Sequence, residues 1–265
     1  MDEFSVWALA GISLLVCCLI MAAAWLWAHK IKNASVVDMF WSYNFPVIAL
    51  ILFLLAPGWE TRRILICFMV ILAGMRLGTH LASRILSHLG EEEGRYQQLR
   101  KEWAPNAERA FFFFFQFQAI SNVILAIPFL VVVMNTKVGL SPFEWAGFIL
   151  WFISITFETI ADRQLATFKK DPANKGKVCS IGLWNYSRHP NYFFEWLMWM
   201  SYFIFALGSP YGWLCIISPA IILYLLLKVT GIPATEEQSL RSKGDAFREY
   251  QKRVSVFVPW FNKTV

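Results

Sequence analysis

The stretch SVWALAGISLLVCCLIMAAAWLWA, residues 5–28, decides the class of fold, because it is long, apolar and free of charged side chains. A membrane-spanning helix needs about 20 mostly apolar residues at a rise of about 1.5 Å each. Asp2 and Glu3 precede the stretch in place of the basic residues that open a signal peptide, and the apolar run is longer than a signal peptide's. We therefore expect a retained transmembrane helix.

Six further apolar stretches follow and make the chain a polytopic membrane protein. Its residues are 57% hydrophobic, 17% aromatic and only 16% charged, which is too apolar for an ordinary soluble domain. The sequence predicts an all-α membrane helix bundle of about seven transmembrane helices, forming one domain over residues 1–265. The expected spans are residues 5–28, 36–56, 64–84, 110–134, 143–162, 191–208 and 211–231.

Basic side chains fall mainly in alternate connections between these spans. Most of the 24 Lys and Arg lie within residues 29–35, 84–109, 163–190 and 228–265. Because basic residues are retained on the cytoplasmic side, we expect the N-terminus outside and the C-terminus in the cytoplasm. The net charge of +6 is spread over several loops and lacks a nucleic-acid motif, so it indicates an anionic lipid surface.

The five cysteines predict neither a disulfide framework nor a metal site. None of them belongs to a C-x-x-C pair, and four lie inside apolar stretches. We interpret them as small apolar core residues.

Polar side chains inside the expected spans gather toward the cytoplasmic side. An ionisable group there costs a few kcal/mol or more, so each one indicates a site with a partner. Their common level predicts a shared polar cavity open to the cytosol, and the alternative is a set of buried ion pairs that hold the bundle together. The residues are Asp38, Trp41, Tyr43, Arg76, His80, Glu158 and Asp162, with Gln116, Gln118 and Asn122 in the fourth span.

The stretch GLWNYSRHPNYFFEW, residues 182–196, brings a second polar set to the start of the sixth span. Pro190 suits the first turn of a helix. The free N–H groups of that turn, together with Arg188, His189 and the lysines that precede them, predict a phosphorylated ligand. At three- and four-residue steps the same face then presents Asn191, Tyr192, Glu195 and Trp199. This face would hold an aromatic or amide ring.

The tail ATEEQSLRSKGDAFREYQKRVSVFVPW, residues 234–260, predicts an amphipathic segment on the cytosolic face. Its apolar residues are Leu240, Phe247, Val254 and Phe257. We expect the segment to lie on the membrane surface and to close over the pocket.

Residues 162–196 and 231–260 closely resemble the DUF1295 family of membrane proteins, described as steroid 5-alpha-reductase-like. The similarity extends upstream to SVVDMFW, RLGTHLASR and RYQQLRKEW, at residues 35–41, 76–84 and 95–103. Related steroid and sterol reductases bind NADPH on the cytosolic side and reduce a conjugated C=C bond. The resemblance implies a cofactor-binding half at about residues 158–265, with roles for Asp162, Lys170, Arg188, Asn191, Tyr192, Glu195, Tyr250 and Arg253, and His189 adjoins them.

The second and third spans depart from the steroid branch of these relatives. That branch uses a Gln-Glu pair in its second helix and a Tyr in its third, whereas this chain has VVDMFWSYNF and Leu81 there. We expect Asp38, Tyr43 and His80 to be catalytic, with His80 or an Asp38-linked Tyr43 as the proton donor. The expected substrate-binding residues are Trp41, Arg76 and Glu158.

A methyltransferase is the alternative. Membrane isoprenylcysteine and phospholipid methyltransferases carry a similar Arg-His-Pro-x-Tyr pattern, followed by Glu-Glu, Leu, Gly and Tyr, which Arg188–Tyr192, Glu236, Glu237, Leu240, Gly244 and Tyr250 match. S-adenosylmethionine has a sulfonium and no phosphate, so the cations between Lys169 and Arg188 favour NADPH.

We therefore expect an NADPH-dependent ene-reductase acting on a steroid-like or lipid enone in a bacterial inner membrane. A non-catalytic lipid carrier or transporter is a third class, and the one-sided clustering of polar groups argues against a path through the membrane.

Overall fold

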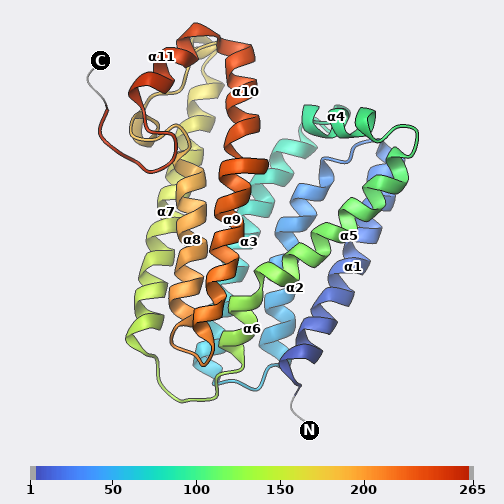
Figure 1. Cartoon of the computed structure of the whole chain (residues 1–265), viewed down its shortest axis with the longest axis vertical. Coiled ribbons are helices and arrows are strands. Elements are labelled where there is room, and N and C mark those ends of the chain that lie inside the picture. Colours follow the sequence, from blue (N-terminus) through green and yellow to red (C-terminus); the bar gives the residue numbers. More distant parts are fainter. Residues whose placement is uncertain (1–3, 263–265) are drawn as a thin grey trace. The chain divides into compact units, whose positions relative to one another are not determined.

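The computed structural model describes residues 4–262, and its regular elements are helices, in the order shown in Figure 1. Within that range there is no β-strand, only one isolated parallel bridge between Ser187 and Ser255. The all-α prediction is thus confirmed. The chain forms two compact units, residues 4–141 with Gly208–Gly212, and Pro142–Leu207 with residues 213–262. The single domain and the cofactor-binding half stay predictions.

The helices confirm an integral membrane protein. Among residues 4–262, five helical segments are long and apolar enough to cross a membrane: α1 (Val6–Ile31), α2 (Val36–Leu55), α3 (Glu60–Leu86), α7 (Pro142–Lys170) and Gly212–Lys243. A bent pair, α5 (Ala107–Leu125) with α6 (Ile127–Val133), makes a sixth. The remaining expected span, residues 191–208, corresponds to α8 (Pro190–Ala206), whose 17 residues make it shorter than these. Seven crossings therefore stay a prediction.

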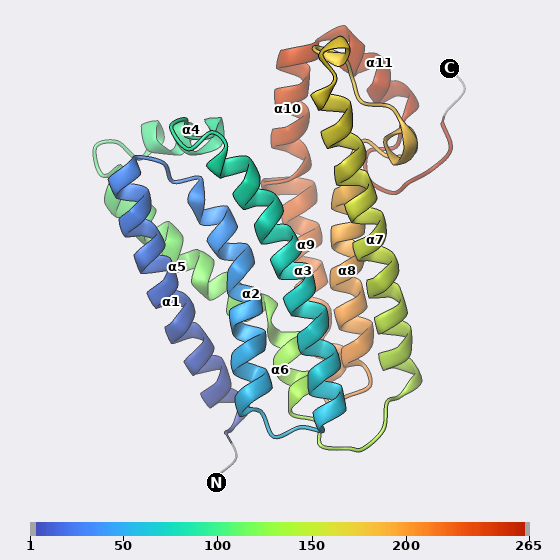
Figure 2. The same ribbon diagram turned by 180° about the vertical axis from the view of Figure 1, so that it is seen from behind.

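In the first unit, α1 packs against α2 and α5, and α2 packs against α3 (Figure 2). The buried stripe of α1 follows helical spacing and consists of Leu9, Ser13, Cys17, Met21, Ala24 and Ala28, while Leu15, Leu19 and Leu26 are exposed. Small residues let helices approach closely. A Cβ on Gly74 would lie 2.4 Å from Pro46, and one on Gly78 would lie 2.5 Å from the Tyr43 ring.

The expected fourth span is broken. Residues 110–134 were expected as one helix, but α5 and α6 meet at a bend of 43°. Pro128 is the physical reason, because it has no N–H to donate and its ring collides with the carbonyl four residues earlier.

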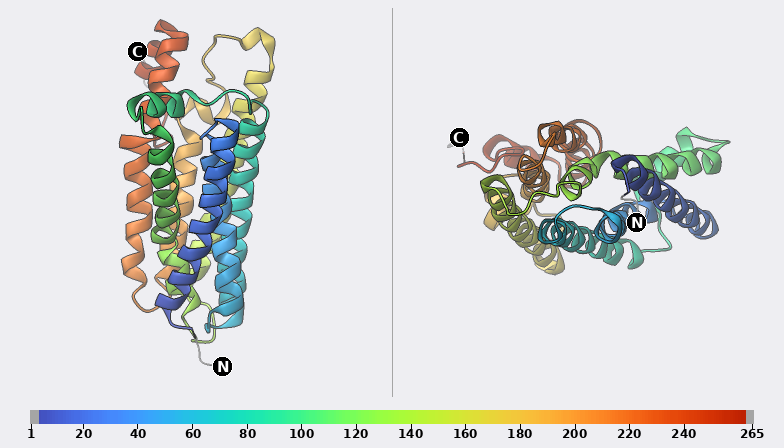
Figure 3. Two further views of the ribbon diagram at one scale, coloured as in Figure 1. Left: turned by 90° about the vertical axis from the view of Figure 1, so that its right-hand side faces the viewer. Right: turned by 90° about the horizontal axis from the view of Figure 1, so that it is seen from below.

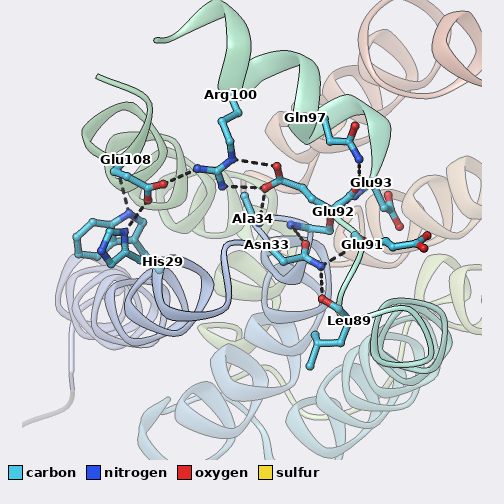
Figure 4. Close-up of polar contacts among 12 residues, drawn as sticks. His29, Asn33, Ala34, Leu89, Glu91, Glu92, Glu93, Gln97, Arg100 and Glu108 are labelled. Carbon is cyan, nitrogen blue, oxygen red and sulfur yellow. Dashed lines mark hydrogen bonds and ion pairs between the residues drawn. The ribbon is translucent and has the colours of Figure 1, made fainter. Parts of the chain in front are cut away.

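Helix α4 (Gly94–Glu102) lies crosswise at one end of the first unit (Figures 1 and 3). Arg100 ties it down, donating two hydrogen bonds of 2.9 Å to Glu92 and a third to Glu108. Glu108 also accepts from Nδ1 of His29 at 2.8 Å. Figure 4 shows these contacts. Hydrogen bonds to Glu92 raise the pKa of Arg100, so the guanidinium stays charged and holds α4 against α1 and α5.

The opposite end of the first unit is closed by Arg62, which is 1% exposed. Its guanidinium donates to the carbonyl oxygens of Asn135, Lys137 and Gly139 at 2.9, 2.6 and 2.6 Å. Asn135 in turn donates to the carbonyl oxygen of Gly208 at 3.2 Å. One buried cation therefore organises the connection that follows α6.

In the second unit α7 and α8 lie side by side, and α8 contacts α9 (Ile217–Tyr224). A Cβ on Gly147 would lie 2.6 Å from the backbone nitrogen of Phe205, so glycine permits this close packing. A π-helical turn at Leu225–Val229 separates α9 from α10 (Ile232–Lys243), and α11 (Asp245–Arg253) follows α10.

The apolar side of the C-terminal segment packs inside the second unit instead of on the membrane surface. Phe247, Tyr250 and Val254 form a buried cluster with Val178 and Leu240. Phe257 packs edge-on against Phe193 at 5.5 Å between ring centroids. The four residues expected to face the membrane surface therefore pack against protein, because the α7–α8 connection and α8 supply the matching apolar surface.

Candidate functional site

The two facing helices α7 and α8 carry a line of paired polar side chains. Asn191 donates to the Asp162 carboxylate at 3.1 Å. Deeper along α8, the Trp199 indole donates to Glu195 at 2.9 Å, and Glu158 of α7 is buried. These hydrogen bonds fix the orientation of the Asn191 amide and of the Asp162 and Glu195 carboxylates.

An ion pair joins the residue two positions before α8 to α10. The Nε of Arg188 donates to Glu236 at 2.6 Å, and the two side chains are only 11% and 16% exposed. The Nη1 of Arg188 donates to the carbonyl oxygens of Gln251 and Val254 at 3.0 and 2.8 Å. Gln251 donates to the second oxygen of Glu236 at 2.8 Å. Arg188 thus binds protein acceptors from α10 and α11.

The start of α8 is held by two further contacts to α10. His189 is buried, and its Nε2 lies 3.3 Å from Glu236. Its ring stacks on Tyr192, with the ring planes 5° apart and the centroids separated by 5.4 Å. The Tyr192 hydroxyl lies 3.1 Å from that of Thr235. One aromatic pair therefore lies between α8 and α10.

Tyr250 fixes α11 to the connection between α7 and α8. Its phenol donates to the carbonyl oxygen of Trp184, and burial raises the pKa of Tyr250, so the proton needed for this bond stays in place. Trp184 donates from its indole to the carbonyl oxygen of Ala161 at 2.9 Å. The Tyr250 hydroxyl is thus used inside the protein, which differs from the cofactor contact implied by the resemblance.

The exposed cations of the second unit differ from Arg188, whose guanidinium is paired inside the protein. Lys169 and Lys170 end α7, and Lys175 and Lys177 follow in the connection to α8. All four are exposed, and none has a hydrogen bond or ion pair to a carboxylate among the residues that the structure describes. Arg253, at the end of α11, is exposed as well. An anionic ligand can reach these five side chains.

The expected catalytic residues lie in the first unit, and their partners differ from expectation. Asp38 accepts a hydrogen bond of 2.6 Å from Tyr96, and the Tyr43 hydroxyl lies 3.3 Å from that of Thr79. Asp38 and Tyr43 are five positions apart on α2, so they point to different sides of the helix. The expected link between Asp38 and Tyr43 is therefore replaced by these two separate pairs.

The other expected residues of the first unit are spread over α2 and α3. Trp41 donates to Ser121 of α5 at 3.0 Å. Arg76 is half-buried and His80 is exposed, both on α3. Within this unit the structure brings Trp41 to α5 and leaves His80 at the surface, and the shared cavity stays a prediction.

Tyr96 is a polar partner that sequence reasoning missed, since it lies in α4, outside every expected span. It is fully buried. Burial is the largest cause that raises the pKa of Tyr96 and the neighbouring Asp38 carboxylate is the second, so the Tyr96 hydroxyl keeps its proton and donates it to the hydrogen bond. Its signal in the sequence is its place in RYQQLRKEW, a segment that resembles the family as a whole and does not single out Tyr96. Glu236 is likewise absent from the predicted reductase site, although Glu236 and Glu237 match the methyltransferase pattern.

Tyr96→Phe is expected to lower the free energy of unfolding by about 1–3 kcal/mol, because the Asp38 carboxylate loses its hydrogen-bond donor. Tyr43→Phe is the matched control, since its 3.3 Å contact is longer and exposed, and its cost should stay below about 1 kcal/mol. The measurement is denaturant unfolding of both variants in detergent. Equal losses of unfolding free energy in the two variants would show that the hydrogen bond from Tyr96 to Asp38 stabilises the fold no more than an exposed contact does.

Among residues 4–262 there is no group of three or more His, Cys, Asp or Glu side chains placed to hold a metal ion. The cysteines described there are unpaired thiols, four of them buried. The arrangement offers charge, hydrogen bonds and aromatic faces to an organic ligand.

Comparisons with known proteins give a family without an assigned activity. An uncharacterised protein of Schizosaccharomyces pombe is 23% identical over 267 residues, covering 88% of this chain and 75% of that protein. A protein of Ustilaginoidea virens named "Probable O-methyltransferase" is 35% identical over 69 residues, covering 26% of this chain and 24% of that protein. No solved structure matches the chain. The model of the family described as "Protein of unknown function (DUF1295)" matches residues 24–254, so the chain belongs to this family.

Proposed function

We propose that this protein is an NADPH-dependent membrane reductase that reduces a conjugated C=C bond of a steroid-like or lipid enone. The observation that carries the proposal is the set of exposed lysines Lys169, Lys170, Lys175 and Lys177 around the end of α7. A dinucleotide phosphate brings several negative charges, and cations without carboxylate partners are suited to bind them. NADPH would supply the hydride, and the protein would supply position and charge.

Asn191, Tyr192 and Glu195 would orient the nicotinamide ring in this proposal. Asn191 and Glu195 are already held by Asp162 and Trp199, so their polar atoms meet a ligand without a large loss of side-chain freedom. Tyr192 adds an aromatic face stacked on His189. The role of Arg188 changes from phosphate ligand to positioning residue, because its guanidinium binds Glu236 and two carbonyl oxygens.

Residues of α2 and α3 are the candidates to bind the substrate and supply the proton. Hydride addition to the β carbon of an enone places negative charge on the carbonyl oxygen, which a nearby O–H or N–H stabilises. The candidates are the exposed His80 and the Tyr43 hydroxyl, with Trp41 and Arg76 as substrate contacts. Asp38, hydrogen-bonded to Tyr96, would fix the local structure of α2 and α4.

The membrane arrangement in this proposal has seven crossings. The 17 residues of α8 are within the range of about 17–25 that can span a bilayer, and α8 packs along α7. With seven crossings and the basic connections retained inside, the N-terminus would lie outside and the lysines of the α7–α8 connection would lie in the cytoplasm. We propose a bacterial inner membrane as the location.

Methyl transfer from S-adenosylmethionine is the second candidate, and the "Probable O-methyltransferase" from Ustilaginoidea virens is the observation in its favour. The methyl-donor sulfonium favours carboxylates and aromatic faces. The stacked His189 and Tyr192 would provide such faces, and Glu195 a carboxylate. The lysines have no role in that reaction, which separates the two candidates experimentally.

Replacing Lys169, Lys170, Lys175 and Lys177 together by Gln is expected to weaken NADPH binding by at least about tenfold, because charged hydrogen bonds to phosphate are lost. The matched control replaces the exposed cations Lys30, Lys32 and Lys101 of the first unit by Gln. Affinities are measured by nucleotide fluorescence in detergent. Unchanged NADPH affinity in the first variant, or an equal loss in both, would remove the phosphate assignment.

A further inference from the structure

A row of apolar side chains remains exposed on the second unit after its core is complete. Its members are Tyr186, Val256, Val258, Trp260 and Phe261, which are 42%, 40%, 51%, 67% and 76% exposed. We call this set the tail row. It differs from the apolar residues expected to face the membrane, since Val254 and Phe257 of the same segment are buried.

The C-terminal part of the tail row, residues 256–261, is fixed by hydrogen bonds to the residues just before α8, which include Tyr186. Arg188 donates from its backbone N–H to Ser255 at 2.8 Å, and the Ser187 hydroxyl donates to the carbonyl oxygen of Phe257 at 2.7 Å. The N–H of Trp260 donates to the carbonyl oxygen of Tyr186 at 2.9 Å. These bonds fix a segment in which Val254 and Phe257 are buried while the tail-row side chains remain exposed.

Hydrogen bonds to α7 determine where along that helix the residues before α8 lie, and with them the tail row. Trp184 donates to the carbonyl oxygen of Ala161, and the N–H of Leu183 donates to Gln164. The exposed apolar side of α7, a helix able to span the membrane, continues to Phe157 and Ile160, while Glu158 is buried. The charged pair Asp162 and Arg163 follows Ala161, so the lipid-facing stretch of α7 ends at this point. The tail row is therefore anchored where α7 leaves the hydrocarbon core.

We propose that the tail row inserts into the headgroup region of the same bilayer that α7 crosses, as an interfacial anchor for the α7–α8 connection. We infer that lipid covers this surface, because the tail row lies at the point along α7 where that membrane-spanning helix leaves the hydrocarbon core. Trp and Tyr are the residues that concentrate at such interfaces, where an aromatic ring meets apolar chains and a polar tip meets water. The inference does not depend on the reaction that the protein catalyses.

The anchor has a consequence for the candidate site. Ser187, Arg188 and the first turn of α8 are bonded directly to the segment that carries the tail row. Lipid contact would thus hold the polar start of α8 at the membrane surface.

The test places an environment-sensitive fluorophore on single introduced cysteines, Val258→Cys in the tail row and Lys252→Cys on α11, in protein reconstituted into phosphatidylcholine vesicles. Lys252 is the matched control, since its side chain is 61% exposed, polar and only six positions away. Labelling of the unsubstituted protein measures the background from native cysteines, four of which are buried. Vesicles with nitroxide lipid, labelled near the headgroup, and aqueous iodide serve as quenchers.

We expect the nitroxide lipid to quench the label at Val258 at least threefold more than the label at Lys252, and iodide to show the reverse order. A label at Val256 must give the same ratio as Val258. Equal iodide quenching at all positions would place the tail row in water and overturn the proposal. Protection of Val258 from both quenchers would mean that protein covers the row, which also overturns it. Unchanged unfolding of each labelled variant in detergent confirms that the fold is intact.

Discussion

Glu236→Ala is expected to lower the free energy of unfolding by about 3–5 kcal/mol, the largest effect of any single substitution considered. The change leaves the Arg188 guanidinium, only 11% exposed, without its carboxylate. Removing one partner of a buried ion pair costs this much because the other charge stays buried and unpaired. His189 and Gln251 lose an acceptor as well. Denaturant unfolding in mixed micelles measures the loss.

Glu237→Ala is the matched control for this prediction. It removes the adjacent carboxylate, whose side chain is 65% exposed and pairs with Arg241 four positions later on the helix surface. Exposed pairs of this kind contribute about 0–1 kcal/mol. The double variant Arg188→Met with Glu236→Leu should recover part of the loss, since no unpaired charge remains. A loss below about 1 kcal/mol in Glu236→Ala would show that the ion pair does not hold α10 to the start of α8.

Arg62→Met is expected to lower the free energy of unfolding by about 3 kcal/mol, because three carbonyl oxygens lose a charged donor at once. The apolar volume of the side chain is largely retained, so the loss reports the hydrogen bonds. Lys137→Met is the control, since Lys137 accepts one of these bonds through its backbone while its own side chain is exposed.

The effect of Arg62→Met should be confined to the connection after α6. Limited proteolysis between Asn135 and Ser141 should become faster in Arg62→Met and remain unchanged in Lys137→Met. Equal stability of the two variants would contradict the view that Arg62 organises this end of the first unit.

The membrane class and the positions of several apolar helices could be predicted from the sequence, because apolar length is a local property. The span expected at 36–56 appears as Val36–Leu55, and that expected at 5–28 appears as Val6–Ile31. The break between α5 and α6 could have been read from Pro128, which lies within an otherwise uniform apolar run. The length of the run concealed this signal.

Side-chain partners could not be predicted in the same way, because they depend on packing between distant segments. Arg188 was expected to bind phosphate, and the structure gives it Glu236, 48 positions later. Asp38 is bonded to Tyr96, 58 positions later, in a helix outside the expected spans. The C-terminal tail shows the same limit, since its helical periodicity indicates an apolar face without indicating whether protein or lipid covers it.

Equilibrium binding of NADPH, NADH and S-adenosylmethionine to the purified protein tests the proposed reaction most directly. A ligand that binds only the folded state raises its stability by an amount set by the ratio of ligand concentration to Kd. At a concentration 100 times the Kd this is about 2.7 kcal/mol, which a thermal shift detects readily. The reductase account predicts stabilisation by NADPH, reduced in the variant that lacks the four lysines of the α7–α8 connection. Stabilisation by S-adenosylmethionine and by neither nicotinamide nucleotide would contradict it and assign methyl transfer instead.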